Sequence, residues 1–311
     1  MSPKPTILVV GSINMDLVVR TPRMPEPGET VLGSGFKTTP GGKGANQAVA
    51  AARLGGNCRM IGLLGEDAFG EGLLAGLKAE GVECTHVGQR PNESTGVAMI
   101  VVDANGENSI VVASGANHKL TPDDIYSSEE AFKGADVVVL QLELTLPTVR
   151  AAIDLGRRHG ARIILDPAPA VRAMHKELFQ VDIISPNASE AEILTGRRAM
   201  EERVDKQVVS ELIGQGAKAV VLKLGARGCL VGMADGHFYK VPTYDVEVVD
   251  TTAAGDAFTA ALAVAVGRGE NMHLAAKFAT AAGALACTKF GAQSAMPTAD
   301  EVAMIMNDQA I

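Results

Sequence analysis

Late in the chain, an aspartate opens an apolar helix directly after a run of small residues. Residues 250–258 read DTTAAGDAF, and a strand-like segment precedes them. Small residues at a helix start leave backbone N–H groups free to bind an anion such as a phosphate. The carboxylate of Asp256 could accept a proton from a hydroxyl group during phosphoryl transfer, or simply balance the helix dipole, which should keep its pKa low. The pattern favours an anion hole at Ala253, Ala254 and Gly255, with Asp256 as general base.

A second polar segment combines glycines with hydrogen-bond donors at the predicted start of another helix. Residues 39–47 read TPGGKGANQ. Glycines let the backbone approach a ligand closely, while Lys43 and Asn46 supply donors at the helix start. A helix-capping loop would also fit, but three glycines, a lysine and an asparagine within the six residues 41–46 are unusual for capping alone.

A third polar segment, Asn14-Met15-Asp16, follows the first predicted strand at its carboxyl end. Ligands gather at this edge of α/β sheets. Asn14 and Asp16 could hydrogen-bond neighbouring hydroxyl groups of a sugar, or form an Asx turn that leaves the strand. Taken alone, the segment favours the turn.

The common phosphate-binding motifs do not fit this sequence. Gly42-Lys43 is followed by Gly44 instead of Ser or Thr, and the position five residues before Gly42 is Lys37, so a Walker P-loop fails at both ends. Residues 11–16 lack the later glycines of a Rossmann fingerprint, and protein-kinase signatures are missing. If the protein binds phosphate, it must do so through another structural motif.

Strand-like and helix-like stretches alternate along most of the chain, which predicts an α/β fold: a doubly wound, mostly parallel sheet with helices on both faces. The predicted strands are Ile7–Val10, Arg59–Leu64, Val137–Leu140, Ile163–Leu165, Ile183–Ile184 and Ala219–Leu224. The predicted helices are Ala45–Leu54, Phe69–Glu80, Leu146–His159, Ala188–Thr195, Val204–Gln215, Asp256–Val266, Met272–Thr288 and Ala299–Met306.

Two segments, 16–39 and 95–113, break the alternation with strand-like pieces and turns. The clearest is Val97–Val102, a turn at 103–106, and then Ser109–Ala113. They predict a small β flap outside the main sheet, either a lid over a site or plain surface hairpins. We expect a single domain, 1–311, with this flap attached.

Composition excludes several classes of protein. The 311 residues are 47% hydrophobic and 21% charged, and 28 Lys and Arg against 36 Asp and Glu give a net charge of −8. Without a basic block, a nucleic-acid partner is not expected. No signal peptide or membrane-length apolar run is visible, so we expect a cytoplasmic protein without a membrane partner. Zinc is not expected, because the cysteines are scattered in apolar runs at Cys58, Cys84, Cys229 and Cys287.

Two of these motifs, PGGKGANQA at 40–48 and DTTAAGDAF at 250–258, resemble the paired signatures of the ribokinase (PfkB) family of sugar kinases. The resemblance extends over essentially the whole chain. The resemblance is most specific to the ribose-specific members of the family, because of two further segments, GSINMD at 11–16 and MPEPGET at 24–30. The resemblance implies a ribokinase-like fold. It also implies an enzyme that transfers phosphate from ATP to the primary 5-hydroxyl of ribose, giving ribose 5-phosphate and ADP.

The resemblance also implies roles for individual residues. Asp256 would be the base, and Glu190 would help to order Mg²⁺ through water. Lys223 replaces the threonine usual in relatives, so it could contact phosphate or point to solvent. The implied sugar-binding residues are Asn14, Met15, Asp16, Gly42, Lys43, Gly44, Ala45, Asn46, Glu143 and Asp256. The implied ATP-binding residues are Asn187, Glu190, Lys223, Leu224, Gly225, Ala226, Arg227, Gly228, Gly255 and Thr280.

The family resemblance further implies an activating potassium ion beside the anion hole, held mostly by backbone oxygen, which suits a hard cation. Ala295 stands where relatives commonly have serine, with Ser294 next to it, so one ligand is replaced. The matching positions are Asp250, Thr252, Ala286, Lys289, Gly291 and Ala295.

Alternatives remain open at this point. A nucleoside kinase needs an aromatic surface for the base, and segment 16–40 offers only Phe36. Deoxyribose and fructose remain possible substrates. A sugar sensor without catalysis would not need Asp256 and the small residues before it. Relatives often pair through the flap strands, so a homodimer is expected.

Overall fold

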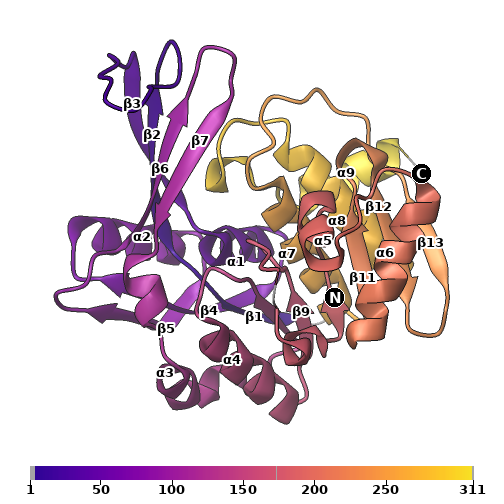
Figure 1. Cartoon of the computed structure of the whole chain (residues 1–311). Helices are drawn as coiled ribbons and strands as arrows, with labels where there is room; N and C mark the ends of the chain where they lie inside the picture. The colour runs from indigo at the N-terminus through magenta and orange to yellow at the C-terminus, as the bar shows by residue number, and fades with distance from the viewer. Residues whose placement is uncertain (1–3, 173, 310–311) are drawn as a thin grey trace.

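The computed structural model describes residues 4–172 and 174–309. A nine-stranded sheet runs through this part of the chain in the order β13-β12-β11-β10-β9-β8-β1-β4-β5 (Figure 1). Its strands are parallel from β5 to β11, while β12 and β13 run antiparallel to their neighbours. The strands are β1 (Thr6–Val10), β4 (Asn57–Gly65), β5 (Glu83–Arg90), β8 (Val137–Leu140), β9 (Arg162–Leu165), β10 (Ile183–Ile184), β11 (Ala219–Lys223), β12 (Cys229–Met233) and β13 (Phe238–Val241).

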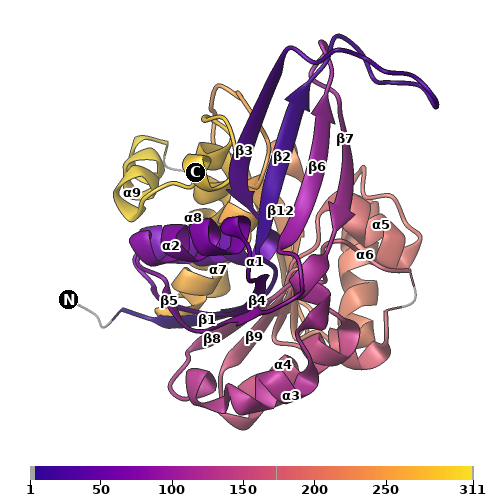
Figure 2. The ribbon, with the colours of Figure 1, turned by 90° about the vertical axis from the view of Figure 1, so that its left-hand side faces the viewer.

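Helices cover both faces of this sheet, which confirms the predicted doubly wound α/β architecture (Figure 2). One layer holds α1 (Lys43–Arg53), α2 (Ala68–Ala79), α7 (Ala254–Gly267), α8 (Met272–Ala286) and α9 (Ala299–Asp308). The other holds α3 (Pro122–Ser127), α4 (Leu146–Arg158), α5 (Ala188–Thr195) and α6 (Glu202–Gln215). No helix in the described residues is long and apolar enough to cross a membrane.

The main sheet separates two hydrophobic cores, and the side chains of β1 contribute to both. Successive side chains of a strand point to opposite faces. Ile7 and Val9 accordingly pack with the α1, α7 and α8 layer, while Leu8 and Val10 pack with the α3, α4 and α6 layer. All four side chains are fully buried. A central parallel strand buried on both faces explains the continuous apolar run in the sequence.

Small side chains bring α1 and α7 close together. Ala48 and Ala51 on α1 and Ala261 and Ala265 on α7 are buried in the same core cluster. Alanine allows two helix backbones to approach more closely than larger side chains do. The two helix starts therefore lie side by side at one edge of the sheet, where Asn46 reaches Asp256.

A second sheet projects from the main body with the order β3-β2-β6-β7 (Figure 2). Its strands are β2 (Asn14–Arg20), β3 (Gly35–Gly41), β6 (Gly96–Val102) and β7 (Asn108–Ala113). The predicted flap and its hairpin are present. The flap begins earlier than expected, because Asn14-Met15-Asp16 forms the start of β2 instead of a turn.

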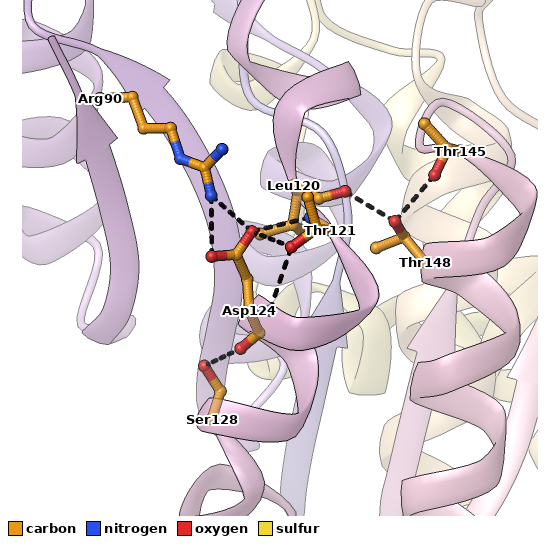
Figure 3. A network of polar contacts seen from close by, with 7 residues as sticks. All are labelled: Arg90, Leu120, Thr121, Asp124, Ser128, Thr145 and Thr148. Carbon is orange, nitrogen blue, oxygen red and sulfur yellow. Dashed lines mark hydrogen bonds and ion pairs between the residues drawn. The ribbon is translucent and has the colours of Figure 1, made fainter.

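One edge of the main sheet is tied to the helix layer by a polar network (Figure 3). Arg90, at the end of β5, donates to both carboxylate oxygens of Asp124 on α3, at 2.8 and 2.6 Å. The same aspartate forms a capping box with Thr121. Thr148 of α4 donates to the carbonyl of Leu120 at 2.6 Å. These contacts hold β5, α3 and α4 together.

The sequence pattern does not predict β5, β12, β13 or α3. Strand β5 lies at the sheet edge and has several exposed polar side chains, so its apolar signal is weak. The predicted helices are present, with ends that differ by one or two residues in most cases, as helix boundaries usually do.

Candidate active site

The carboxyl ends of β1, β8, β9, β10 and β11 lie at one edge of the main sheet, because these neighbouring strands are parallel. Polar residues follow each of them. Helices α1, α5 and α7 begin at the same edge, as the hydrogen bonds below show. Ligands of α/β proteins bind in this kind of crevice. The polar residues are Ser12, Gln141, Glu143, Asp166, Ser185, Asn187 and Lys223.

Asp256 lies in the first turn of α7, and only 4% of it is exposed. Asn46 Nδ2 donates to its Oδ2 and Gln47 Nε2 donates to its Oδ1, each at 3.0 Å. Burial raises the pKa of Asp256, and Asp166 raises it further, while Lys43 and the two amides lower it. The expectation of a low pKa is wrong, because desolvation outweighs the helix dipole. A raised pKa makes the carboxylate a stronger proton acceptor.

A buried network supports this carboxylate from behind. Gln47 Nε2 also donates to Asp166 Oδ2 at 3.0 Å, and Gln141 Nε2 donates to Gln47 Oε1 at 2.5 Å. Asp166 accepts two further bonds, from Thr259 Oγ1 at 3.2 Å and from Lys223 Nζ at 2.9 Å. Gln47, Gln141 and Asp166 are not among the site residues predicted from the sequence. The rule that ligand groups follow the carboxyl ends of strands would have selected Asp166, which directly follows Leu165.

Asn14 and Asp16 are two residues apart on β2, so they share one face of the flap strand. Met15 points the other way and packs against the core. Asn14 Oδ1 accepts a hydrogen bond from Asn117 Nδ2 at 2.7 Å, which fixes its amide group. Asp16 lies against Gly41, where an added Cβ would come within 2.3 Å of its Oδ2. A side chain at Gly41 would therefore displace the Asp16 carboxylate.

Glu143 follows β8 and turns toward the start of α1. Its Oε2 accepts from Lys43 N at 3.1 Å and from the Ser12 hydroxyl. Burial, together with the negative charges of Glu143 and Asp256, raises the pKa of Asp16 to about 7. Burial opposes the charge on Lys43, but the surrounding carboxylates outweigh it and raise the pKa of Lys43 above its ordinary value. The site is thus an acidic cluster with a lysine among its members.

Not every implied sugar-binding residue offers a free group. Gly42 has a φ of +88° at the start of α1, a conformation that favours glycine. Gly44 N donates to Ser12 Oγ at 3.3 Å and Ala45 N donates to Ser12 O at 2.9 Å, so both amides are already bonded. Asn46 Oδ1 is buried and has no hydrogen-bond partner among the described residues, which leaves it free to bind a ligand hydroxyl.

The predicted anion hole lies at the start of α7. Ala253 has a φ of +58°, and it caps the helix without any side-chain hydrogen bond. Ala253, Ala254 and Gly255 are half-buried, so their backbone is open to a ligand. Uncapped N–H groups at a helix start attract anions. Ala254 N already donates to Thr251 O at 3.3 Å, so the anion hole at Ala253, Ala254 and Gly255 stays a prediction.

Asn187 and Glu190 form a capping box at the start of α5, with bonds of 2.7 and 2.8 Å. The box uses Oε2 of Glu190, and its Oε1 bonds to no described residue. Burial raises the pKa of Glu190, Lys223 lowers it and Asp166 raises it. Both motif residues therefore cap the helix, yet one carboxylate oxygen remains available for a hydrated cation.

The implied nucleotide loop begins at Lys223, whose side chain is only 11% exposed, so it does not point to solvent. Gly228 has a φ of +79°, and a Cβ there would come within 2.0 Å of the Val241 carbonyl. The guanidinium of Arg227 turns to Asp205 at 2.5 Å and so anchors the loop to α6. Ala226 and Gly225 are exposed, and the Leu224 amide bonds within the loop.

Thr280, on α8, is buried, and its hydroxyl donates to the Ala276 carbonyl at 2.7 Å. It therefore has its hydrogen-bond partner within the helix. Its neighbour across the helix–sheet contact is Cys229 Sγ, at 3.6 Å. Any role of Thr280 toward a nucleotide would be one of packing.

The implied potassium residues are only partly brought together. Asp250 Oδ1 accepts from Thr252 N at 2.9 Å, and its Oδ2 accepts from Gly291 N at 2.9 Å. Asp250 N donates to Cys287 O at 3.2 Å, which brings the end of α8 near, next to buried Ala286. Lys289 pairs instead with Glu301, and buried Ala295 adds no side-chain oxygen. In the described residues, no cluster of three or more His, Cys, Asp or Glu could hold a metal ion.

Comparisons with known proteins bear on the family and the fold of this chain. A family model described as pfkB family carbohydrate kinase matches residues 4–299. The ribokinase of Haemophilus influenzae is 39% identical over 296 residues, covering 95% of this chain and 96% of that protein. The deoxyribokinase of Salmonella typhi is 38% identical over 296 residues, with the same coverage. A solved structure of Arabidopsis thaliana ribokinase complexed with ribose and ATP is 34% identical, with a TM-score of 0.90, covering 98% of this chain and 99% of that chain.

The raised pKa of Asp16 predicts a pH-dependent stability. Its value of about 7, against 3.8 ordinarily, means that the folded state holds this proton more tightly than the unfolded chain does. The ionised carboxylate therefore destabilises the fold above about pH 7, and this cost fades as the pH falls toward 3.8. We expect Asp16→Asn to raise the free energy of unfolding at pH 8 by roughly 1–3 kcal/mol and to change it little at pH 4.5.

Urea unfolding of both proteins at the two pH values measures this difference. Glu107→Gln, at an exposed turn of the same flap, is the matched control and should leave the free energy of unfolding unchanged at either pH. An equal effect of Asp16→Asn at both pH values would contradict the shifted pKa.

Proposed function

The chain belongs to the pfkB family of carbohydrate kinases, and we propose that this sugar kinase transfers the γ-phosphoryl group of ATP to the primary 5-hydroxyl of D-ribose. The products are ribose 5-phosphate and ADP. The observation that carries the proposal is Asp256, a buried carboxylate at an uncapped helix start, with Asn46 and Gln47 donating to its two oxygens. Pure sugar binding would not need a proton acceptor beside an anion hole.

The chemistry follows from that placement. Asp256 takes the proton of the sugar hydroxyl as its oxygen attacks the γ-phosphorus. The new oxygen–phosphorus bond forms while the bond from that phosphorus to the bridging oxygen breaks, and the electron pair leaves with ADP. Backbone N–H groups of the predicted anion hole, Ala253, Ala254 and Gly255, would face the charge on the transferring group and stabilise it.

The sugar would lie between the flap and the start of α1. Asn14 and Asp16 come from β2, Glu143 follows β8, and the free Oδ1 of Asn46 points into a buried setting. Carboxylates accept strong hydrogen bonds from hydroxyl groups. This set of acceptors suits a polyhydroxylated molecule, and Phe36 is the only aromatic residue in segment 16–40, which disfavours a nucleoside base.

The nucleotide would lie on the opposite side, along α5 and the loop from Lys223 to Gly228. Asn187 would meet phosphate, and the free Oε1 of Glu190 would help to order a hydrated Mg²⁺. Magnesium supplies charge neutralisation for the phosphates when it is bound. Thr280 would pack near the adenine.

A potassium ion would sit by Asp250, with backbone oxygens as the main ligands. Hydrogen bonds from Thr252 and Gly291 hold the Asp250 carboxylate in place, and oxygen donors suit a hard cation. A bound cation there would add positive charge near the start of α7. The donor set fits such an ion, although Ala295 contributes no side-chain oxygen.

We further infer a cytoplasmic homodimer that pairs through the flap. The hairpin β6–β7 carries several large apolar side chains that are exposed in the single chain: Met99, Ile110, Val111 and Val112. Exposed apolar patches commonly mark protein–protein contacts. A second flap packed on this surface would cover them.

Asp256→Asn is expected to lower kcat by ~10²–10⁴, since the proton acceptor is lost. The fold should survive, because the free Oδ1 of Asn46 can rotate to accept from the new amide. Sugar affinity should change by less than about tenfold, since Asn14 and Asp16 remain. Steady-state kinetics and calorimetry measure the two quantities. Asp123→Asn, in the first turn of α3, is the control, and a kcat loss below about tenfold would reduce Asp256 to a helix cap.

Ribose is expected to give a higher kcat/KM than deoxyribose, fructose or adenosine when ADP release is measured with each. A sugar without its 2-hydroxyl leaves an acceptor such as Asp16 unpaired, which costs about tenfold or more. If the enzyme prefers deoxyribose, the proposed substrate becomes deoxyribose, in line with the similar deoxyribokinase. Preference for a nucleoside would overturn it.

Potassium is expected to raise the turnover rate, and Ala295→Ser should lower the concentration that gives half of the effect by adding a side-chain oxygen. Rates are compared in potassium and in tetramethylammonium at equal ionic strength. The same rate in both salts would show that the Asp250 region binds no activating cation.

A further inference from the structure

Lys223 has an unusual position within this site. Its backbone ends β11, pairs with Asn187 in a parallel bridge, and donates to the Pro186 carbonyl at 2.9 Å. Its Nζ lies 2.9 Å from Asp166 Oδ1, and a Cβ at Gly255 would come within 3.6 Å of the same Nζ. The ammonium group therefore lies between the starts of α5 and α7.

The ion pair does not account for this placement by itself. Asp166 is 2% exposed, and its Oδ2 accepts from Gln47 and Thr259, while its Oδ1 accepts only from Lys223 among the described residues. An ammonium group has three N–H donors. Only one of those on Lys223 is bonded within the described residues, to Asp166. Burying an under-bonded cation costs free energy unless an anion completes its surroundings.

The surroundings specify the kind of anion. The start of α7, which has no side-chain cap, presents positive partial charge toward this region, whereas Asn187 and Glu190 cap the start of α5. Glu190, which also lies near Lys223, uses one carboxylate oxygen in its capping box. The ammonium group of Lys223, with two donors unused, and the start of α7 lie close together, which fits a group with several charged oxygens. A phosphoryl group has that charge and geometry.

We infer that Lys223 is a catalytic residue that donates hydrogen bonds to the phosphoryl group during its transfer, and that Asp166 is the positioning residue that holds the ammonium beside Gly255. The inference rests on the proposed phosphotransfer. Lys223 forms no covalent bond and loses no proton in this role. Because its Nζ lies beside the anion hole, its contact strengthens as charge develops on the transferring oxygens, so kcat depends on it more than nucleotide binding does.

Lys223→Met keeps the length of the side chain and removes its charge. We expect kcat to fall about 10²-fold, as for other lost anion-hole donors, while the KM for ATP changes less than about threefold. Lys218→Met is the matched control, since Lys218 stands just before β11, at the strand's opposite end, and pairs with Asp182 at 2.7 Å. It should leave kcat unchanged.

A second variant separates catalysis from structure. Lys223→Met alone leaves Asp166 without its cation and should lower Tm. Adding Asp166→Asn removes the unpaired charge, so the double variant should regain most of the lost Tm. If Lys223 served only the ion pair, kcat of the double variant would equal that of Asp166→Asn alone. If it contacts phosphate, kcat of the double variant stays well below that of Asp166→Asn alone after stability returns.

A binding measurement tests the contact between Lys223 and the phosphoryl group without turnover. ADP with aluminium fluoride and sugar imitates the transferring group, and calorimetry compares its affinity with that of ADP alone. We expect Lys223→Met to bind ADP normally and to lose about tenfold or more of the tightening that aluminium fluoride gives the wild type. Full tightening in Lys223→Met would overturn the inference. A wild type that phosphorylates no sugar would instead overturn the proposed function.

Discussion

The site depends on two buried carboxylates that one amide group holds close together. Gln47 Nε2 donates to Asp256 and to Asp166, each at 3.0 Å. Burial raises the pKa of Asp256, and the charge of Asp166 at this short range raises it further. Positive groups near the two carboxylates offset their repulsion. These groups are the ammonium groups of Lys43 and Lys223 and the start of α7. Removing any of these would leave an acidic pair in a poorly solvated place.

This electrostatic requirement explains features of the fold that lie outside the site. Gln47 is on α1 and Asp256 is on α7, so the two helix starts must lie side by side. Alanine-rich helix faces permit that approach, and the pairing of α1 with β1 needs a glycine at 44, because a Cβ there would come within 2.5 Å of Gly11. The scarcity of large side chains in the α1–α7 contact is therefore a condition for the chemistry, because bulkier residues would separate the two amides from the carboxylate.

Much of this arrangement was predictable from the sequence, and the failures share a cause. Apolar runs and helix caps are local signals, so the main strands, the flap and the helix that starts at Asp256 follow from neighbouring residues. The partners of Asp256 are far away in sequence: Asn46 is 210 residues distant. The environment of an ionisable group depends on such long-range neighbours, which is why a low pKa was a reasonable but wrong expectation for Asp256. For the same reason, Arg227 could not be seen to turn toward Asp205.

Charge is distributed unevenly across the site, and this asymmetry limits how a sugar and a nucleotide can bind. Asp16 and Glu143 make the flap side acidic, and the raised pKa of Asp16 reports that concentration of charge. On the other side, Lys223 and the start of α7 contribute positive charge next to the carboxylates of Asp166 and Glu190. A triphosphate would meet the ammonium donors of Lys223 on the second side, whereas the hydroxyl groups of a sugar would gain carboxylate acceptors on the first. Asp256 lies between the two sets, where the proposed transfer needs a carboxylate that faces both a hydroxyl proton and an incoming phosphoryl group.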